Sequence, residues 1–424
     1  MLYSRSRPLR LDTMECRLTP ALAAAIDAST LTPPEGTAVT LTGTATDATN
    51  PATATFAWTV TKDGNPFTTG TGSTFTFTPD DNGTFVVTLT VTDPDAGGAT
   101  ATATDTITAT NVPPTATLTG PAVSVPGLPV AFTLGATDPS SADTAAGFTF
   151  NIDWDSDGTI DQTVTGPSGT VVTHTFTGTG SNTVTVTATD QDGGVSAPVT
   201  QTVSLQQAAL VDDVLNPGHQ VLAVAGTDGN DKISLVPASS GRVRVLENGQ
   251  SLGTFAQAGR IAVFGMAGDD NIHLAGSIRT PAWLDGGDGN DNLQGGKGND
   301  VLRGGAGDDH LNGGQGADIL IGGTGGDRIL GGPGNDLMVA GTTTFDTDDA
   351  ALNSILQLWT GGGSLASRVD AIRTSTTAAL TATGSSPTVV DDGSADLITG
   401  AAGGAWVFAD PTQDKVTGNK HSLI

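Results

Sequence analysis

Residues 286–339 read GGDGNDNLQ GGKGNDVLR GGAGDDHLN GGQGADILI GGTGGDRIL GGPGNDLMV, which is six consecutive blocks of nine residues. Each block has glycine at places one, two and four, aspartate at place six, and leucine, isoleucine or methionine at place eight. Glycine tolerates positive φ, so six residues can turn tightly while the other three form a short strand. One block cannot bury its aliphatic side chain alone, and the pattern therefore predicts stacked coils over residues 284–341. The inward side chains are expected at Leu293, Leu302, Leu311, Leu320, Ile329 and Met338.

The aspartates at place six carry the candidate chemistry. If two blocks form one coil, equivalent aspartates are eighteen residues apart and form two files. Adjacent coils lie about 4.8 Å apart, where two carboxylates repel by about 3 kcal/mol at an intermediate dielectric constant, so a cation must sit between them. Carboxylates and backbone carbonyls form an all-oxygen ligand set that prefers calcium, and calcium binding should therefore be coupled to folding. The predicted files are Asp291, Asp309 and Asp327 on one side, and Asp300, Asp318 and Asp336 on the other.

This segment resembles the RTX (repeats-in-toxin) family of calcium-binding β-rolls. The resemblance implies several bound Ca²⁺ ions, held by the aspartates at place six and by carbonyl oxygens of the glycine turns. A disordered Gly/Asp-rich linker is the alternative, and the aliphatic residue at every ninth position argues against it. The place-one glycines, which we expect to be metal ligands through their turns, are Gly286, Gly295, Gly304, Gly313, Gly322 and Gly331.

The composition limits the classes of partner. The chain has 424 residues, a formal net charge of −27 and a pI near 4.1, which disfavours nucleic acid and anionic membranes and favours divalent cations. No apolar stretch is long enough to span a bilayer. Aromatic residues make up only 4%, so we expect thin β-cores of Val, Thr, Ala and Leu. The single Cys16 excludes an internal disulfide.

Residues 1–29 are predicted to be an N-terminal arm or an export signal. Arginines at positions 5, 7, 10 and 17 precede the short apolar run LTPALAAAI, an order that loosely matches a signal peptide. The string LDTMECRLTPA also resembles a leader found at the start of many large secreted bacterial proteins. We therefore expect a secreted, extracellular or cell-surface bacterial protein. A disordered arm without a targeting role is the alternative for this segment.

Alternating strand patterns with turn residues between them predict two antiparallel β-sandwiches, over residues 30–112 and 113–206. Both units share an early Trp-bearing strand and a late Thr/Val strand that ends in Thr-Asp, and they resemble PKD (polycystic kidney disease type) immunoglobulin-like domains. The resemblance implies extracellular spacers or adhesive modules without catalysis. The expected cores are Trp58, Phe75, Phe77, Phe85, Val87, Leu89 and Val91, then Phe148, Phe150, Ile152, Trp154, Phe176, Val184 and Val186.

The string DWDSDGTID at residues 153–161 places alternate carboxylates before a glycine turn. It begins like an EF-hand calcium loop, but Val164 stands where the bidentate glutamate belongs, and the sequence shows no flanking helices. We interpret it as an acidic turn with a structural role. An ion site at Asp153–Asp161 stays open as the alternative.

Residues 207–283 are predicted to contain a linker and then lead-in coils of the same solenoid. Two isolated nonapeptides there add Asp231 and Asp270 to the candidate metal ligands. A strand pair over RVRVLENG and LGTFAQAGRIAVF is expected to turn at Asn248 and Gly249.

Beyond Gly341 the hydrophobic period changes. Residues 342–385 are predicted to hold two short amphipathic helices that pack over the end of the roll as a cap. Residues 386–424 are predicted to be degenerate terminal repeats, in which Asp396 keeps the ligand position and Ala405 has lost it. The apolar helix faces are expected at Leu352, Ile355, Leu356 and Trp359, and, after a cap at Ser364, at Leu365, Val369 and Ile372.

The predicted fold class is therefore all-β, with two tandem immunoglobulin-like β-sandwiches followed by a parallel β-roll that carries a small helical insertion near the C-terminus. The five histidines are scattered, and the sequence has neither an H-E-x-x-H nor a G-x-S-x-G motif, so we expect no enzyme.

Three functions are compatible with this sequence. The first is an extracellular calcium-binding structural or adhesive protein, whose partners would be cell-surface or matrix components. The second is a C-terminal module that folds on meeting external calcium and so drives secretion. The third, a polysaccharide-binding or hydrolytic surface protein, would need exposed aromatic rings or paired carboxylates. For the roll we expect a calcium-specific gain of β-structure that weakens when Asp309 and Asp318 are replaced by alanine.

Overall fold

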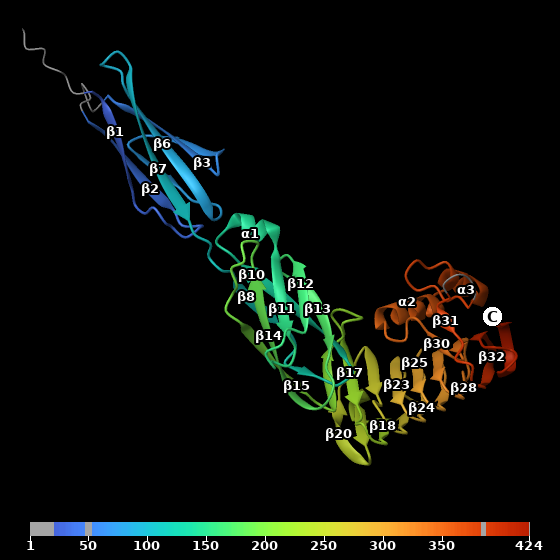
Figure 1. Cartoon of the computed structure of the whole chain (residues 1–424). Coiled ribbons are helices and arrows are strands. Elements are labelled where there is room, and N and C mark those ends of the chain that lie inside the picture. Colours follow the sequence, from blue (N-terminus) through green and yellow to red (C-terminus); the bar gives the residue numbers. More distant parts are fainter. Residues whose placement is uncertain (1–20, 47–52, 383–386, 424) are drawn as a thin grey trace, which may run out of the picture.

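Figure 1 shows a computed structural model of the chain, in which two β-sandwiches are followed by a coiled β-region. The structure describes residues 21–46, 53–382 and 387–423, without the side chains of 401–403 and 419–423. The first twenty residues of the predicted arm lie outside these ranges. The all-β fold class with a small helical insertion is confirmed. None of the described helices is long and apolar enough to cross a membrane.

The first sandwich packs a three-stranded antiparallel sheet, β1-β2-β5, on a four-stranded one, β4-β3-β6-β7. Its predicted core is confirmed, except that Phe75 is only half-buried. The alternating threonines point to solvent, which is why one face of each strand suffices for the core. The strands are β1 Ala23–Ala28, β2 Val39–Thr46, β3 Thr55–Lys62, β4 Asn65–Thr71, β5 Thr74–Phe77, β6 Gly83–Asp93 and β7 Ala99–Ala109.

Strand β1 lies inside the segment that we predicted to be an arm. It pairs antiparallel with β2, from Ala23 opposite Thr46 to Ala28 opposite Leu41. Ala24 and Ile26 pack against the core of the sandwich. The predicted boundary at residue 29 is therefore wrong, because small and apolar side chains that alternate over six residues also suit an edge strand.

The second sandwich packs sheet β13-β10-β8 on sheet β12-β11-β14-β15-β9, with a short helix, α1, at the end that faces the first sandwich. All seven predicted core residues are buried. The elements are β8 Thr115–Thr119, β9 Val123–Ser124, β10 Pro129–Thr137, α1 Ser141–Ala146, β11 Phe148–Asp153, β12 Gln162–Gly166, β13 Thr170–Thr175, β14 Gly180–Thr189 and β15 Val199–Leu205.

The region that we predicted to be a linker after residue 206 is structured. Strand β16, Ala208–Asp212, pairs antiparallel with β17, Gln220–Ala225, and the turn between them is held by a buried ion pair of 2.8 Å from Arg260 to Asp213. Phe264 and Val221 belong to the same apolar core as the second sandwich. The linker prediction is wrong because the first coil of a solenoid exposes an apolar end, and here the second sandwich covers it.

The roll has two walls of parallel strands, and every coil contributes one strand to each wall. One wall runs β17-β21-β23-β25-β27-β29 and the other β18-β22-β24-β26-β28, and β32 pairs with the last strand of both. Across the six nonapeptides the register is eighteen residues, with Leu284 opposite Leu302 and Leu293 opposite Leu311. The predicted inward residues are all fully buried in one cluster.

The wall strands are β18 Lys232–Pro237, β21 Arg260–Phe264, β22 Asn271–Leu274, β23 Ala282–Asp288, β24 Asn292–Gln294, β25 Val301–Ala306, β26 His310–Asn312, β27 Ile319–Thr324, β28 Arg328–Leu330, β29 Asp336–Val339 and β32 Leu397–Phe408. Strand β33, Lys415–Leu423, stacks on β32. The two-residue strands β30 Thr342–Thr343 and β31 Val389–Val390 pair beside the roll.

The hairpin in the lead-in region is confirmed over its turn. Strands β19, Val243–Glu247, and β20, Gln250–Phe255, pair around Asn248 and Gly249, whose φ values are 49° and 80°. The second strand ends earlier than predicted, because residues 260–264 leave the hairpin and form β21 of the roll.

Both predicted helices form, as α2 Asp349–Thr360 and α3 Leu365–Arg373. Asp348 caps α2 by accepting the backbone N–H of Ala351, and Ser364 caps α3 by accepting that of Ser367. Their predicted position is wrong. They cover the outer face of one wall (Figure 1), while β33 continues the stack beyond them.

The sequence carries a signal for this lateral position. Place seven is apolar in every second block, at Val301, Ile319 and Leu337, and these side chains are buried against the helices. In the intervening blocks the same place holds Asn292, His310 and Arg328. An outward apolar stripe with a period of eighteen residues on one wall needs a cover along its length, so the helices lie on the side of the roll.

Candidate metal centre

The place-six aspartates form a continuous ladder along one edge of the roll. The Oδ1 of each aspartate accepts the backbone N–H of the aspartate in the preceding coil, at distances between 2.7 and 3.0 Å. The stacked turns therefore fix each carboxylate through its neighbour. The order in this first file is Asp231, Asp270, Asp291, Asp309, Asp327, Asp396 and Asp414.

A second, shorter file lies on the other edge. Asp300 Oδ1 accepts from Ala282 N at 2.8 Å, Asp318 Oδ1 accepts from Asp300 N at 2.8 Å, and Asp336 Oδ1 accepts from Asp318 N at 3.2 Å. The next residue in register is Ala405, opposite Asp336, so this file ends there.

The second carboxylate oxygen distinguishes the candidate ligands. In seven described aspartates of the roll, Oδ2 is buried and has no hydrogen-bond partner. Beside each place-one glycine, Oδ2 of its own block lies against the glycine Cα: a Cβ on Gly304 would be 2.2 Å from Asp309 Oδ2 and 2.3 Å from the carbonyl oxygen of Gly322. Carboxylate and carbonyl oxygens of adjacent coils thus converge where only glycine leaves room. We call these seven residues the open aspartates: Asp270, Asp291, Asp309, Asp318, Asp327, Asp336 and Asp396.

Burial raises the pKa of all seven carboxyls. Hydrogen bonds from the ladder N–H groups lower the pKa but do not offset desolvation, and in most of them neighbouring aspartates raise it further. The pKa is raised to about 6 for Asp291 and Asp396, to about 7 for Asp270, Asp309 and Asp336, and to about 8 for Asp318 and Asp327.

These oxygens fit a calcium ion. Buried oxygens without donors require either a proton or a cation, and carboxylate and carbonyl oxygens are the hard ligands that calcium prefers. The residues that would hold the ions are the seven open aspartates, together with carbonyls such as those of Gly286, Gly304, Gly313, Gly322 and Gly331, which approach the Cβ space of the glycine one coil before. A bound calcium would supply the positive charge that lets all these carboxylates be ionised together.

Two predicted ligands differ from the others. Asp231 Oδ2 accepts from the backbone N–H and the hydroxyl of Thr227 at 2.6 and 2.9 Å, and its Oδ1 accepts from Asn248. Asp300 Oδ2 accepts from Gly296 N at 2.8 Å. Each of the two is the first aspartate of its file. In each, both carboxylate oxygens already accept a hydrogen bond. Asp231 and Asp300 therefore do not belong to the aspartates with an open oxygen, and their role as ligands stays a prediction.

Two features of the ladder were missed from the sequence. Asp414 lies eighteen residues after Asp396 and continues the first file, although no glycine pair precedes it. Residues at place five of the nonapeptides form a second, exposed ladder of hydrogen bonds. In it, Asp308 N donates to Asn290 Oδ1 at 2.7 Å and Gly326 N donates to Asp308 Oδ1 at 2.8 Å. The eighteen-residue register, applied to every place and beyond the glycines, would have found both.

The acidic turn at Asp153–Asp161 is closed by its own backbone. Asp153 Oδ2 accepts from Gly158 N at 2.9 Å, and Asp161 Oδ2 accepts from Trp154 N at 2.7 Å. Burial alone would raise the pKa of Asp153, but backbone N–H groups of the turn together lower it. Asp153, Asp155 and Asp161 place ligand oxygens within 4.8 Å of one another. Asp153 Oδ1 is buried without a hydrogen-bond partner, so the structural interpretation and the ion site both stay predictions.

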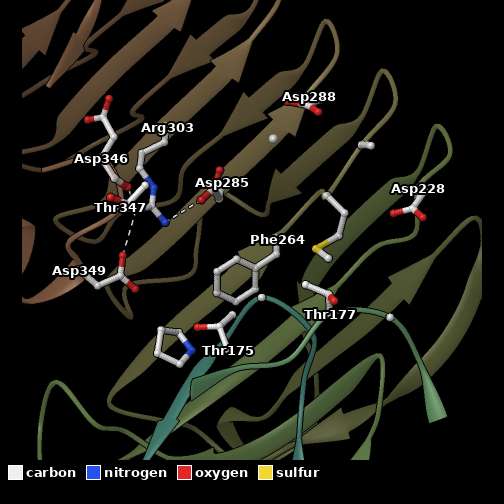
Figure 2. Close-up of a pocket in the computed structure, with 16 residues that line it drawn as sticks. Thr175, Thr177, Asp228, Phe264, Asp285, Asp288, Arg303, Asp346, Thr347 and Asp349 are labelled. Carbon is white, nitrogen blue, oxygen red and sulfur yellow. Dashed lines mark hydrogen bonds and ion pairs between the residues drawn. The ribbon is translucent and has the colours of Figure 1, made fainter. Parts of the chain in front are cut away.

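A cavity of about 760 Å³ lies where the second sandwich, the first coils and the start of α2 meet (Figure 2). Arg303 lines it, with Nη2 at 2.6 Å from Asp285 Oδ2 and Nη1 at 2.9 Å from Asp349 Oδ1. Arg303 also donates to the carbonyl of Asp346. The Arg303 guanidinium thus connects the N-terminus of α2 to the roll. The cavity lies at this contact between structural elements.

Protein-family models match both regions of the chain. The PKD domain model matches residues 20–109 and 111–205, and the RTX calcium-binding nonapeptide repeat model matches residues 285–320 and 313–342. Two PKD domains precede an RTX repeat region. RTX repeats bind Ca²⁺ as a structural ion, and both domain types are typical of secreted bacterial proteins. The first PKD match begins at residue 20, in agreement with strand β1.

Solved structures resemble parts of the chain. The PKD domain of an M14-like peptidase from a Thermoplasmatales archaeon is 28% identical and covers 23% of this chain and 98% of its own, with a TM-score of 0.20. A tetra-tandem repeat in the extending region of a large adhesion protein is 16% identical, covering 54% and 56% of the two chains, with a TM-score of 0.28. No curated protein matches the sequence.

The raised pKa values predict how the metal-free RTX roll responds to pH. Each open aspartate binds its proton more tightly when folded than when unfolded, so its contribution to stability is largest at low pH and is lost as pH rises toward the folded pKa of about 6 to 8. With calcium chelated by BAPTA, we expect the roll to be more stable at pH 5 than at pH 6.5, by on the order of 3 kcal/mol or more, and to lose its urea transition by pH 8. Urea unfolding followed by tryptophan fluorescence measures this. Stability that rises with pH under chelation would contradict it.

Proposed function

We propose that this protein is an extracellular calcium-binding structural or adhesive protein, whose RTX roll folds when Ca²⁺ binds between stacked Gly/Asp turns. The observation that carries the proposal is the set of seven buried aspartate Oδ2 atoms without hydrogen-bond partners, arranged in register along the roll. A roll built in this way is stable only with its carboxylates protonated or bound to cations. At the pH and calcium concentration outside a cell, calcium is the available partner.

The PKD domains suit a spacer or adhesive role in this proposal. They follow one another in a line that ends on the roll (Figure 1), and the shared core of the second PKD domain and the first coils makes the roll a rigid end of that line. Among the described residues, the exposed large apolar side chains are aliphatic, namely Leu31, Val86, Ile160, Val171, Val195 and Val390. Rings for stacking on sugars are therefore not supplied by this set, and we favour protein or matrix partners over polysaccharides.

A calcium-triggered secretion module is the second candidate. The same unpartnered carboxylates support it, because in calcium-poor cytoplasm ionised aspartates would keep the roll unfolded and fit for export. We further propose that the chain is not an enzyme, in line with its scattered histidines and the absence of hydrolase motifs from the sequence.

Counting bound calcium in two isosteric variants of the full chain tests the proposal. Asp309→Asn removes a charge from an open carboxylate, and we expect loss of at least one ion and a rise of roughly tenfold in the calcium concentration at half-saturation. Asp231→Asn is the matched control, because both oxygens of Asp231 already accept hydrogen bonds. Native mass spectrometry gives the ion count and calorimetry the affinity. An unchanged count in Asp309→Asn would reject the assignment.

A further inference from the structure

The junction between the two PKD domains holds a second group of carboxylates, which the RTX repeats do not include. Glu35, Asp81 and Asp143 place ligand oxygens within 4.8 Å of one another, and so do Asp138, Asp143 and Asp190. Glu35 and Asp81 belong to the first domain and the other three to the second. Asp143 is common to both triads, so carboxylates from two domains surround it.

Two of these side chains are almost completely buried and keep carboxylate oxygens without a hydrogen-bond partner. Asp143, in the first turn of α1, is 0% exposed, and neither of its carboxylate oxygens has a hydrogen-bond partner. Glu35 is 1% exposed; its Oε1 accepts from Val112 N at 2.7 Å, while Oε2 has no partner. A buried carboxylate is normally hydrogen-bonded. Here the fold turns such oxygens toward further carboxylates.

Other oxygens of the junction share this property. Asp138 Oδ2 and Asn111 Oδ1 are also buried without a partner, although Asp138 Oδ1 accepts from Ser140 N and Asn111 Nδ2 donates to Asp190. In each of these two side chains one polar atom is hydrogen-bonded, and the remaining oxygen has no partner. This is the pattern of the open aspartates in the roll, built from different elements.

The ion pairs among the described residues neutralise only part of the charge at the junction. Lys62 Nζ lies 3.1 Å from both Asp80 and Asp81 at the edge of the cluster. Desolvation and neighbouring carboxylates raise the pKa of Glu35, Asp138 and Asp143. The ionised cluster therefore disfavours the observed contact between the domains unless a further cation is bound.

We propose that the junction between the two PKD domains binds calcium, and that the ion fixes the orientation of one domain relative to the other. Its ligands would be Glu35 Oε2, Asp138 Oδ2, Asn111 Oδ1 and the Asp143 carboxylate, with Asp81 and Asp190 beside them. The set holds only oxygen, which selects calcium over zinc, and it has more oxygens than a magnesium ion with retained waters needs.

Direct contacts between the domains lie beside the carboxylates, where an ion would act. Ser140 Oγ donates to the carbonyl of Asp80 at 2.9 Å, and Ser141 N donates to the same oxygen at 3.1 Å. A Cβ on Gly36 would lie 2.7 Å from Pro139 Cβ, so the two backbones touch there. These contacts keep the domains close only while the neighbouring carboxylates do not repel one another.

Ion counting and a distance measurement on the full chain test this proposal. Val86 and Val171 are 37% and 60% exposed on the two domains and can be replaced by spin-labelled cysteines after Cys16→Ser. In calcium we expect a narrow distance distribution between the labels, and in BAPTA a distribution at least twice as broad. Asp143→Asn and Glu35→Gln should each lose at least one bound ion and show the broad distribution even in calcium.

The controls separate the junction from the roll and from misfolding. Asp105→Asn removes a half-buried charge on β7 outside the cluster and should change neither readout. Asp309→Asn should lower the ion count without broadening the label distance. Asp143→Asn should also unfold at a higher temperature than the unsubstituted chain in BAPTA, because it removes a repelled charge, and at a lower one in calcium. An unchanged ion count, an unchanged distance distribution, or destabilisation by Asp143→Asn in both conditions would overturn the proposal.

Discussion

We expect that chelating calcium at pH 8 unfolds the RTX roll while the two PKD domains stay folded. At pH 8 the seven open aspartates, whose pKa values lie at about 6 to 8, are half or more ionised in the metal-free roll. Each ion present at about a hundred times its dissociation constant adds about 2.7 kcal/mol to stability. The free energy added by several such ions is as large as the ~5–15 kcal/mol by which a domain is normally stable. The loss of all of them therefore leaves most of the roll without a stable fold.

Tryptophan fluorescence of the full chain reports this unfolding. Trp283, Trp359 and Trp406 are buried in and beside the roll, whereas Trp58 and Trp154 lie in the two PKD cores. We expect a red shift on chelation from the first three only, and a heating transition of the PKD domains that survives chelation. Magnesium at equal ionic strength should not reverse the shift, because it requires a smaller and stricter octahedral site.

The full chain is needed for this measurement. In a fragment that begins at residue 207, Phe264, Val221 and Val211 would lose their packing contacts with the second PKD domain. Its failure to fold would then say nothing about calcium. A roll that keeps its fluorescence and β-structure in chelator at pH 8 would contradict the role that we give to the open aspartates.

Replacing Gly305 by alanine is expected to destabilise the roll by about 3 kcal/mol or more, even in saturating calcium. Gly305 has a φ of +114°, which side-chain-bearing residues rarely adopt, and its Cβ would lie 2.0 Å from the carbonyl oxygen of Gly287 in the preceding coil. The obstruction is backbone, so the coils must separate to relieve it. Since this glycine is held in register by its neighbours, the strain would spread along the stack.

Gly276→Ala is the matched control for this substitution. Gly276 lies in an exposed turn of the lead-in coils, and no atom lies within 4 Å of the position that its Cβ would occupy. Urea unfolding in saturating calcium compares the two variants with the unsubstituted chain. If Gly305→Ala proved as stable as Gly276→Ala, the close stacking of the glycine turns would be wrong.

Much of the RTX region could be predicted from local sequence, because a repeat interacts mainly with its equivalent in the next coil. A period of nine residues, doubled to eighteen, is sufficient to place Leu293 on Leu311 and Asp291 on Asp309. The PKD cores could be predicted for a similar reason, since strand alternation alone decides which face of β6 is buried. The helices α2 and α3 were predictable from their caps and apolar spacing, but their position on the side of the roll was not recognised.

The continuation of the aspartate ladder across inserted segments was evident only from the tertiary structure. Asp327 N donates to Asp396 Oδ1 although 69 residues separate them, and Asp231 and Asp270 are 39 residues apart. The cost of closing a loop grows only slowly with its length, so an inserted segment can leave the roll and return in register. A sequence period cannot report that return, because it is lost within the insertion.

The sequence by itself determined the repeat, the two sandwiches and the kind of ion that stacked Gly/Asp turns would hold, because these follow from backbone periodicity and ligand chemistry. Only the tertiary structure decided which aspartates keep an open oxygen, since donors such as Thr227 and Gly296 reach Asp231 and Asp300 through the local course of the turn. It also brought Glu35 and Asp143 together across two domains. Residues 108 positions apart share no local pattern, and only the packing of one domain on the next can place them side by side.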